Sequence, residues 1–453
     1  MRTNTRRDFI ARGLTAGAAA VVLPLEALAR RRWNDSSASS DPGYGPLRPV
    51  RDATTGLPLL ELPDGFRYLS MGWTGDPLDG GAPTPARHDG MAAFAGSGGL
   101  AHLVRNHEMP VGPAFDAGRA YDPFAGGGTT TLTFDPAAER LVAARVSLAG
   151  TLLNCAGGPT PWGTWLTCEE TVLGPDRDPR LQQPHGYIFE VPVSGEASRE
   201  PLAAMGRYVH EAVAVDPATG VVYQTEDANP AGLYRFVPAV AGQLHRGGHL
   251  EMLAVRGRPR ADLRRGQHAG VVLETHWVEI GDPGGGSHRS GMRESVSSQG
   301  RRGGGATFAR LEGAWHADGR VYFTSTTGGN ATTGQVWELT PAADQLRLIY
   351  ESPGPHELDM PDNLTVSPRG GLVLCEDGAR NPFIHVLTRD GRITPLARNA
   401  VVLRGERRGL HGDFRSGEFA GATFSPDGRW LFVNIQTPGI TLAITGPWER
   451  GPA

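Results

Sequence analysis

The densest group of chemically versatile side chains lies at residues 154–170, which read Asn-Cys-Ala-Gly-Gly-Pro-Thr-Pro-Trp-Gly-Thr-Trp-Leu-Thr-Cys-Glu-Glu. Cys168 comes at the end of an apolar strand pattern and is followed directly by Glu169 and Glu170. A thiolate is a soft metal ligand and carboxylates are hard ones, so this set suits iron or zinc at the sulfur and calcium or magnesium at the oxygens. The alternative is that Cys168 is a small buried apolar residue and that both glutamates face water.

Further acidic residues adjoin apolar strand patterns along the rest of the chain, so they are expected to point from strand ends into a shared cavity. Carboxylates gathered in this way raise one another's pKa unless cations bind between them. Each acid alone is more typical of a solvated turn, and only the whole set predicts a metal site. The segments are Asn106-His107-Glu108, His210-Glu211, Glu226-Asp227, Arg310-Leu311-Glu312, Asp362-Asn363, Glu376-Asp377 and Glu418.

Arg310 lies two residues before Glu312 and offers a planar fork of donors that matches phosphate or carboxylate oxygens. Its alternative role is a salt bridge with a neighbouring glutamate. The glycine- and threonine-rich run at 126–131 lacks the Gly-Lys-Ser/Thr ending of a phosphate-binding loop and is predicted to be a turn. The sequence contains no Gly-x-Ser-x-Gly and no His-Glu-x-x-His motif, so little supports a serine hydrolase or a zincin.

Short strands joined by tight turns must position these side chains. The 453 residues include 63 glycines and 36 prolines, and from Leu57 onward a short apolar strand, a polar turn and another short strand recur. With hardly any helical periodicity, the pattern predicts an all-β fold, a β-propeller of about six blades. A β-sandwich array and a β-helix are the alternatives. The clearest predicted hairpins lie around 134–136, 215–223, 315–323, 366–374, 387–393 and 424–432.

The N-terminus has the pattern of an export signal. Arg6-Arg7 precedes an uncharged, small and apolar stretch at 13–25 and then Ala27-Leu28-Ala29, which predicts a twin-arginine signal peptide at 1–29. The alternative is an ordinary basic N-terminus. The signal implies the twin-arginine export machinery as a partner and a periplasmic or secreted location. Residues 30–56 are rich in Ser, Pro, Asp and Arg and are predicted to form a flexible tether before a propeller domain at 57–453.

Composition narrows the partners. The formal net charge is -4 and no long basic run occurs, so nothing indicates nucleic-acid binding, and small molecules or ions are the expected partners. The sequence does not give the oligomeric state, and a monomer is the expectation. The sequence has only three cysteines, a low and odd number that argues against a disulfide framework. In an oxidising compartment a disulfide between Cys155 and Cys375 is conceivable.

Several motifs occur in a joint order from about Pro63 to Pro447 that resembles the PhoX-type alkaline phosphatase family. Single motifs are weak signals, whereas their order along nearly the whole mature chain is specific. They are residues 160–170, Gly206-Arg207-Tyr208-Val209-His210-Glu211, Arg310-x-Glu312-Gly313, Pro361-Asp362-Asn363-Leu364 and 417–422 followed by Phe424-Ser425-Pro426-Asp427-Gly428.

The resemblance implies a six-bladed propeller that holds ferric iron and calcium and hydrolyses small phosphate monoesters by in-line attack, with the metals polarising the phosphoryl oxygens. Cys168 would match the iron-binding cysteine, and Glu211 and Glu312 would match acidic metal ligands. Arg310 would match a catalytic, phosphate-binding arginine, and Asn106 a polar group near the phosphate. Further metal ligands are expected in the matching motifs at Glu169, Asp362, Asn363, Glu376 and Glu418.

Two other classes of function compete with this reading. One is a propeller that binds calcium for structure and recognises a ligand without catalysis. The other is a propeller lactonase or phosphotriesterase with calcium in its channel. An iron held by the thiolate of Cys168 would fit the phosphatase and has no role in the other two.

Overall fold

A computed structural model describes residues 43–285, 294–378 and 380–453. The predicted signal peptide at 1–29 and the first part of the predicted tether, 30–42, lie outside the described residues. In the described part, strands dominate and the one α-helix is α3 (Val296–Arg302). No helix in that part is long and apolar enough to cross a membrane.

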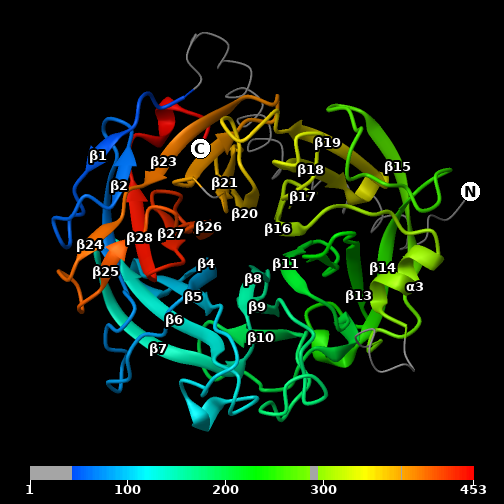
Figure 1. Cartoon of the computed structure of the whole chain (residues 1–453), viewed down its shortest axis with the longest axis horizontal. Coiled ribbons are helices and arrows are strands. Elements are labelled where there is room, and N and C mark those ends of the chain that lie inside the picture. The colour runs from blue at the N-terminus through cyan, green and yellow to red at the C-terminus, as the bar shows by residue number, and fades with distance from the viewer. Residues whose placement is uncertain (1–42, 286–293, 379) are drawn as a thin grey trace, which may run out of the picture. The chain divides into compact units, whose positions relative to one another are not determined.

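Two antiparallel sheets follow one another in the first part of the domain, each with its earliest strand nearest the centre of Figure 1. The first contains β4 (His88–Ala95), β5 (Ala101–His107), β6 (Gly127–Asp135) and β7 (Arg140–Thr151). The second contains β8 (Asn154–Pro159), β9 (Thr164–Glu169) and β10 (Ile188–Pro192).

A nine-stranded sheet makes up the middle of the chain. Its first half contains β11 (His210–Val215), β12 (Val222–Glu226), β13 (Leu233–Pro238) and β14 (Gly248–Val255). Its second half contains β16 (Leu311–Ala317), β17 (Arg320–Ser325), β18 (Gln335–Thr340) and β19 (Gln345–Glu351). The outer strand β15 (Val272–Glu279) pairs with both β14 and β19 and so joins the halves.

The last two large sheets combine strands from both ends of the domain. One contains β20 (Pro361–Val366), β21 (Leu372–Glu376), β22 (Phe383–Leu387) and β23 (Ile393–Asn399), with β2 (Leu60–Leu62) and β1 (Arg48–Val50) on its outer edge. The other contains β26 (Phe419–Phe424), β27 (Leu431–Ile435), β28 (Ile440–Thr445) and β3 (Arg67–Met71). A small hairpin of β24 (Val402–Arg404) and β25 (His411–Asp413) lies between them in sequence.

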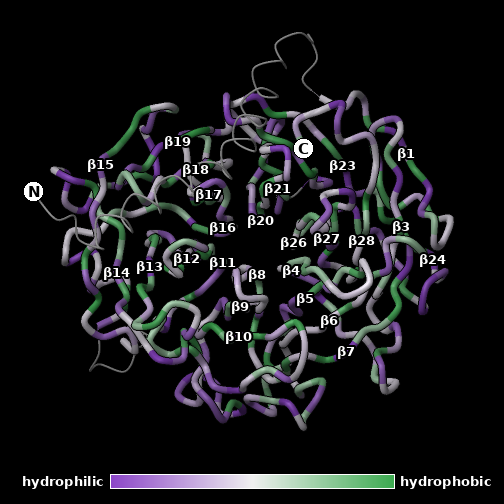
Figure 2. Tube along the Cα trace, turned by 180° about the vertical axis from the view of Figure 1, so that it is seen from behind, coloured by the Kyte–Doolittle hydropathy of each residue, from purple (hydrophilic) through white to green (hydrophobic). Residues whose placement is uncertain are grey.

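The innermost strands form a closed ring, in the order β4, β8, β11, β16, β20, β26 and back to β4. Apolar clusters fill the spaces between successive sheets; for example, Leu103 and Phe134 of one sheet pack with Trp430 and Phe432 of the next. Figure 2 shows the ring from behind, with hydrophobic residues in all of its sheets. The described residues thus form an all-β, propeller-like fold, as the sequence predicts, and the pairing of β3 with β28 closes it.

All six predicted hairpins are confirmed as connections between consecutive antiparallel strands. The turn between β16 and β17 consists of Asp318 and Gly319, both at positive φ (50° and 70°), as a two-residue hairpin turn requires. Longer turns use aspartate: the Asp135 carboxylate accepts the amides of Ala137 and Ala138 at 2.9 and 3.0 Å. Local turn chemistry therefore explains why these segments reverse where they do.

The folded unit begins before Leu57, the residue at which the propeller domain was predicted to start. β1 pairs with β2, and the Tyr44 ring packs edge-on against Phe66 and Trp448. The Tyr44 hydroxyl also accepts the amide of Ala453 at 2.9 Å. Residues 44–50 thus belong to the same compact unit as the C-terminus.

Candidate active site

The six inner strands share one local register. The first residue of each pairs with the last residue of the following strand, and a β-bulge comes shortly afterwards. This repetition gives the second residue of every inner strand an equivalent place, which we call the ring position. The first pairs are His88 with His107, Asn154 with Glu169, His210 with Glu226, Leu311 with Ser325, Pro361 with Glu376 and Phe419 with Ile435.

Five of the six ring positions carry a side chain that can bind a metal. Successive residues of a strand point to opposite sides, so equivalent positions present their side chains in the same sense. Cys155 is half-buried and the other five residues are buried. The ring residues are Asp89, Cys155, Glu211, Glu312, Asp362 and Ala420.

A second set of residues lies one position beyond the end of each following strand, and we call it the mouth position. The amide of each mouth residue donates to the carbonyl just before the inner strand, at 2.8 to 3.1 Å. Four of the six are acids, and these four are partly exposed, unlike the buried acids of the ring. The mouth residues are Glu108, Glu170, Asp227, Thr326, Asp377 and Gln436.

Direct contacts bring the ring and mouth residues together. The Cys155 thiol donates to Glu211 Oε1 at 3.1 Å, and its Sγ lies 3.9 Å from Asp89 Oδ1. One ligand atom each of Cys155, Glu170 and Glu211 lies within 4.8 Å of the others. Residues as far apart in sequence as Asp89 and Glu211 therefore share one site.

Burial and mutual repulsion oppose ionisation of these acids. Burial, reinforced by neighbouring carboxylates, raises the pKa of Asp89, Glu211 and Glu312 well above the usual range. The same causes raise the pKa of Glu170 to about 10 and that of Asp362 to about 7. Without cations, several of these carboxyl groups must therefore stay protonated at neutral pH.

The donor set fits multivalent cations. Burial, followed by the charges of Asp89 and Glu211, raises the pKa of the Cys155 thiol well above its usual value. Bound cations would offset the cost of ionising this thiol and the surrounding carboxylates. The site therefore offers one sulfur ligand and several oxygen ligands whose ionisation a metal would favour.

Arg310 lies at the edge of this acidic cluster. Its Nε and Nη2 donate to the two oxygens of Asp227 at 2.9 and 3.1 Å, and Nη2 also contacts Glu312 Oε1. Burial opposes its charge, but Glu312 and Asp227 raise the pKa of Arg310, so it stays cationic. The side chain keeps 32% of its exposure, which leaves it accessible to an anion at the mouth. Arg87 precedes β4 as Arg310 precedes β16, and both have positive φ, 49° and 47°.

Besides Arg310, five of the ten residues predicted from sequence lie in or beside the cluster. Glu211, Glu312 and Asp362 occupy ring positions. The Asn363 side chain donates from Nδ2 to Asp362 Oδ1 at 3.2 Å and accepts at Oδ1 from the Gly421 main-chain amide at 3.0 Å. Burial and then Asp377 raise the pKa of Glu418 well above its usual range. With Arg310, six of the ten predicted residues lie here, and their individual roles stay predictions.

The structure does not bring Cys168 to the cluster. Its side chain is fully buried in an apolar cluster that includes Leu166, Ile188 and Tyr208. Its pKa is raised by burial and, among charged groups, by the adjacent Glu169 alone. Cys155 is instead the thiol beside the carboxylates, and all three cysteines are free, so the conceivable Cys155 to Cys375 disulfide is absent.

Glu169 and Glu376 also face away from the cluster, because their hydrogen-bonding capacity is used within their own sheets. Glu169 accepts the amides of Leu152 and Gly186 at 2.8 Å each and the His185 ring at 2.6 Å. Glu376 accepts the amides of Asp359 and Phe383 at 2.8 Å each and contacts the His385 ring at 3.0 Å. In both cases the next residue, Glu170 or Asp377, is the one at a mouth position.

Asn106 is fully buried. The resemblance implies a place for it near the phosphate, but its side chain instead forms hydrogen bonds with the main chain. Its amide donates to the carbonyls of Cys155 and Ala156 at 2.9 and 2.7 Å. Its oxygen accepts from Trp165 Nε1 and Thr167 Oγ1, both at 2.9 Å. No donor of this amide is left for a substrate.

Sequence reasoning missed Asp89 entirely and did not consider Cys155 as a ligand. A signal was present: an inner strand begins at His88-Asp89, Asn154-Cys155 and His210-Glu211, with a polar residue before the ring residue each time. Aligning these dipeptides by strand order would have indicated both residues.

The two neighbouring glutamates give a direct test of the register. We expect Glu169→Gln to lower the free energy of unfolding by about 3 kcal/mol, because it disrupts a buried charged network, and to leave the metal content of the purified protein unchanged. Glu170→Gln should weaken metal binding by more than about tenfold without destabilising the metal-free protein. Elemental analysis and thermal unfolding of both variants measure this. A Glu169→Gln protein of normal stability that has lost its metal would contradict the assignment.

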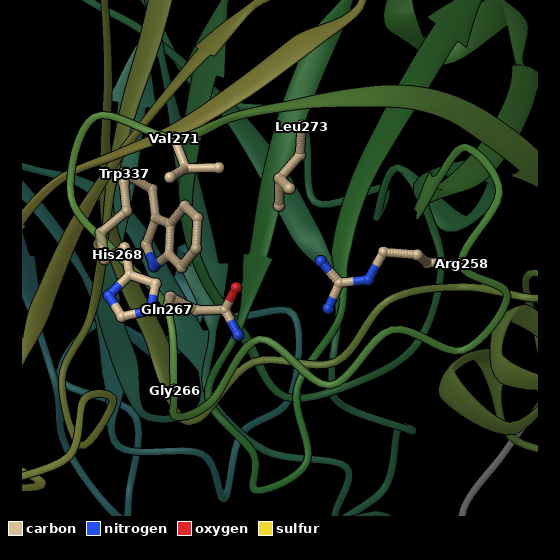
Figure 3. A pocket seen from close by; sticks show the side chains of 8 residues that line it. Arg258, Gly266, Gln267, His268, Val271, Leu273 and Trp337 are labelled. Carbon is tan, nitrogen blue, oxygen red and sulfur yellow. The ribbon is translucent and has the colours of Figure 1, made fainter.

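A separate cavity is lined in part by residues of β15, β18 and β19 in the nine-stranded sheet (Figure 3). It measures about 160 Å³, and its lining includes Arg258, Gln267, His268 and Trp337. None of its lining residues is a ring or mouth residue. The candidate site is therefore the acidic cluster and not this cavity.

Solved structures support the fold. The chain is similar to Pseudomonas fluorescens PhoX, solved in complex with vanadate, a transition state analogue, with 18% identity over 89% of this chain and 98% of that chain and a TM-score of 0.67. A Xanthomonas campestris gluconolactonase is 12% identical over 89% of this chain and 98% of that chain, with a TM-score of 0.45. Staphylococcus aureus virginiamycin B lyase, solved with quinupristin, is 11% identical over 84% of this chain and 99% of that chain, with a TM-score of 0.41. The last two are too distant to support any inference.

Among curated proteins, none matches the chain. The family model described as alkaline phosphatase PhoX matches residues 42–141 and 126–439, which together span most of the chain. The matched region contains every ring residue and every mouth residue. The chain therefore belongs to the PhoX alkaline phosphatase family, and it is a phosphatase of the phosphoric monoester hydrolase type.

Proposed function

We propose that this phosphatase hydrolyses small phosphate monoesters at a centre of iron and calcium ions held by the ring and mouth residues. The observation that carries the proposal is the convergence of the Cys155 thiol with the carboxylates of Asp89, Glu170 and Glu211 in a buried site. Such a group is unfavourable without cations, because burial and repulsion raise the pKa of every one of these side chains.

The ligand chemistry supports two kinds of metal. The single sulfur suits iron, which binds thiolates well, and the many carboxylate oxygens suit calcium. We assign iron to the side of the site with Cys155, Glu170 and Glu211, and calcium to the side with Asp362 and Glu418. When bound, these cations would polarise the phosphoryl oxygens and offset the charge that develops in the transition state.

The chain's own contribution to catalysis is mainly orientation of the phosphate. Arg310 keeps its charge and presents a fork of N–H donors at the mouth, fixed in direction by Asp227. It would bind two phosphate oxygens and align the ester for in-line displacement. The partly exposed mouth favours small phosphorylated substrates whose alcohol portion extends into solvent.

We further propose that the propeller has six blades. The closed ring of six inner strands and the six repeated registers support this count, with the nine-stranded sheet regarded as two blades joined by β15. We also propose that the protein is exported through the twin-arginine machinery to the periplasm or beyond, and acts as a monomer. The arginine pair and apolar stretch of residues 1–29 support the export proposal.

Substitution of Arg310 tests the phosphate-binding role. We expect Arg310→Lys to lower kcat/KM for p-nitrophenyl phosphate by about 100-fold, because a single ammonium cannot replace the two-pronged contact. It should also weaken inhibition by inorganic phosphate. The matched control is Arg264→Lys, which alters an exposed arginine paired with Asp262. Equal losses in both variants, or an unchanged kcat/KM in Arg310→Lys, would remove Arg310 from the site.

A further inference from the structure

A third repeated position lies beside the ring, one residue before the end of the second strand of each pair. We call it the brace position. In five of the six pairs this residue faces the β-bulge of its own inner strand, where the hydrogen-bonded ladder is interrupted. In the sixth pair, Asn434 is in register with Ala420, directly before the bulge. The brace residues are Asn106, Cys168, Thr225, Thr324, Cys375 and Asn434.

Four of these side chains donate a hydrogen bond to the neighbouring inner strand. Each bond ends on the main-chain carbonyl of a ring residue, and each runs to the next inner strand around the ring. The bonds are Asn106 Nδ2 to Cys155 O at 2.9 Å, Thr225 Oγ1 to Glu312 O at 2.6 Å, Thr324 Oγ1 to Asp362 O at 2.9 Å and Asn434 Nδ2 to Asp89 O at 2.5 Å.

The braces satisfy carbonyls that the bulges deprive of ladder partners. A buried carbonyl without a donor is unfavourable, so each brace fixes the rotation of a peptide unit that carries a candidate ligand. The brace side chains are themselves oriented: Asn434 Oδ1 accepts from Thr441 at 2.6 Å, as Asn106 accepts from Trp165 and Thr167. This rigid support acts on main chain that no cation would contact directly.

The two cysteines at brace positions make the pattern sharper. Cys375 faces the side of the ring occupied by Ala420, which cannot bind a metal, and no brace bond to Ala420 occurs there among the described residues. Cys168 faces the strand that begins at His210-Glu211, and among the described residues no brace bond reaches the Glu211 carbonyl; the Glu211 side chain contacts the Cys155 thiol. Strong donors therefore occur at four brace positions, and all four support a ring residue with a ligand side chain.

We infer that Asn106, Thr225, Thr324 and Asn434 are positioning residues that preorganise the metal ligands of the neighbouring strand through its main chain. The inference rests on the proposed metal centre. The strand that follows each inner strand thereby gains a role in metal affinity. Loss of a hydrogen bond that supports a metal ligand changes metal affinity by about 10- to 100-fold.

Thr324 offers the cleanest test, with calcium alone as the probe. Thr324→Val has nearly the same shape and removes the donor to Asp362, so the calcium dissociation constant should rise by about tenfold, whereas Thr324→Ser keeps the hydroxyl and should retain wild-type affinity. The matched control is Thr365→Val on β20, the strand of Asp362, because the buried Thr365 hydroxyl has no hydrogen-bond partner in the described structure. Calorimetric titration of the full chain measures all four proteins.

Thermal unfolding of the metal-free forms tests whether the variants are folded. If Thr324→Val fails to fold, Thr225→Val, which removes the brace on Glu312, takes its place. Unchanged affinity in the folded brace variants, or a loss of the same size in Thr324→Ser or Thr365→Val, would overturn the inference while leaving the metal centre intact. A wild-type chain that binds no calcium would overturn both.

Discussion

Replacing Cys155 with alanine is expected to abolish iron binding and to lower phosphatase kcat/KM by more than about 100-fold. The thiol is the sulfur nearest the carboxylates, 3.1 Å from Glu211 Oε1 and 3.9 Å from Asp89 Oδ1. Its removal leaves only hard oxygen ligands, which retain calcium but hold iron less well. Metal analysis and hydrolysis of p-nitrophenyl phosphate by the same preparation measure both effects.

Cys168→Ala is the matched control for this substitution. Its side chain lies in an apolar cluster, so the expected result is a loss of about 1 kcal/mol in the free energy of unfolding, from the small cavity, with metal content and activity retained. Both substitutions remove one sulfur atom, so any difference in metal content between the two variants shows which cysteine is a metal ligand and which is a core residue. Iron lost from Cys168→Ala and kept by Cys155→Ala would reverse the assignment.

Metal removal is expected to change how stability depends on pH. For an acid whose pKa is raised in the folded state, the folded protein binds more protons than the unfolded one between the two pKa values, so stability falls as pH rises through that window. For Asp362 the window runs from 3.8 to about 7, and for Glu170 from 4.5 to about 10. The metal-free protein should therefore be most stable in mild acid.

The expected size of this effect is large. For Asp362 alone, the shift from 3.8 to about 7 corresponds to about 4 kcal/mol of stability lost by the time the pH has risen above 7. We expect Tm of the chelated protein to fall by at least about 5 °C between pH 5 and pH 9, and excess calcium to abolish the fall. Calorimetric scans with and without calcium measure this, and a chelated protein that gains stability toward pH 9 would show that the acids are not massed as described.

The strands and turns could be read from the sequence because the signals are local. Pairs such as Asp318-Gly319 specify a hairpin within a few residues, and all six predicted hairpins occur. The closure by β3 depends on pairing with β28, hundreds of residues later, and no local pattern indicates it. The early start of the folded unit at Tyr44 likewise depends on contacts with Trp448 and Ala453 at the far end of the chain.

Part of the acidic cluster could be predicted from the sequence, and the strand register explains why Glu169 and Glu376 each miss it by one residue. Because successive side chains alternate between the two sides of a strand, Glu169 and Glu170 serve different purposes although they are neighbours. The same holds for Glu376 and Asp377. The sequence favours Cys168 over Cys155 because Cys168 adjoins two glutamates, whereas Cys155 meets its carboxylates only when β8 packs beside β4 and β11.

Chelation and reconstitution of the purified wild-type protein test whether hydrolysis depends on metals bound at the acidic cluster. The protein would be depleted of metal, assayed on p-nitrophenyl phosphate, and assayed again after iron and calcium are restored. We expect hydrolysis to disappear on depletion and to return only when both metals are bound. Hydrolysis that persists in metal-free protein, or none from a protein shown to contain both metals, would contradict a metal-dependent phosphatase site at the acidic cluster.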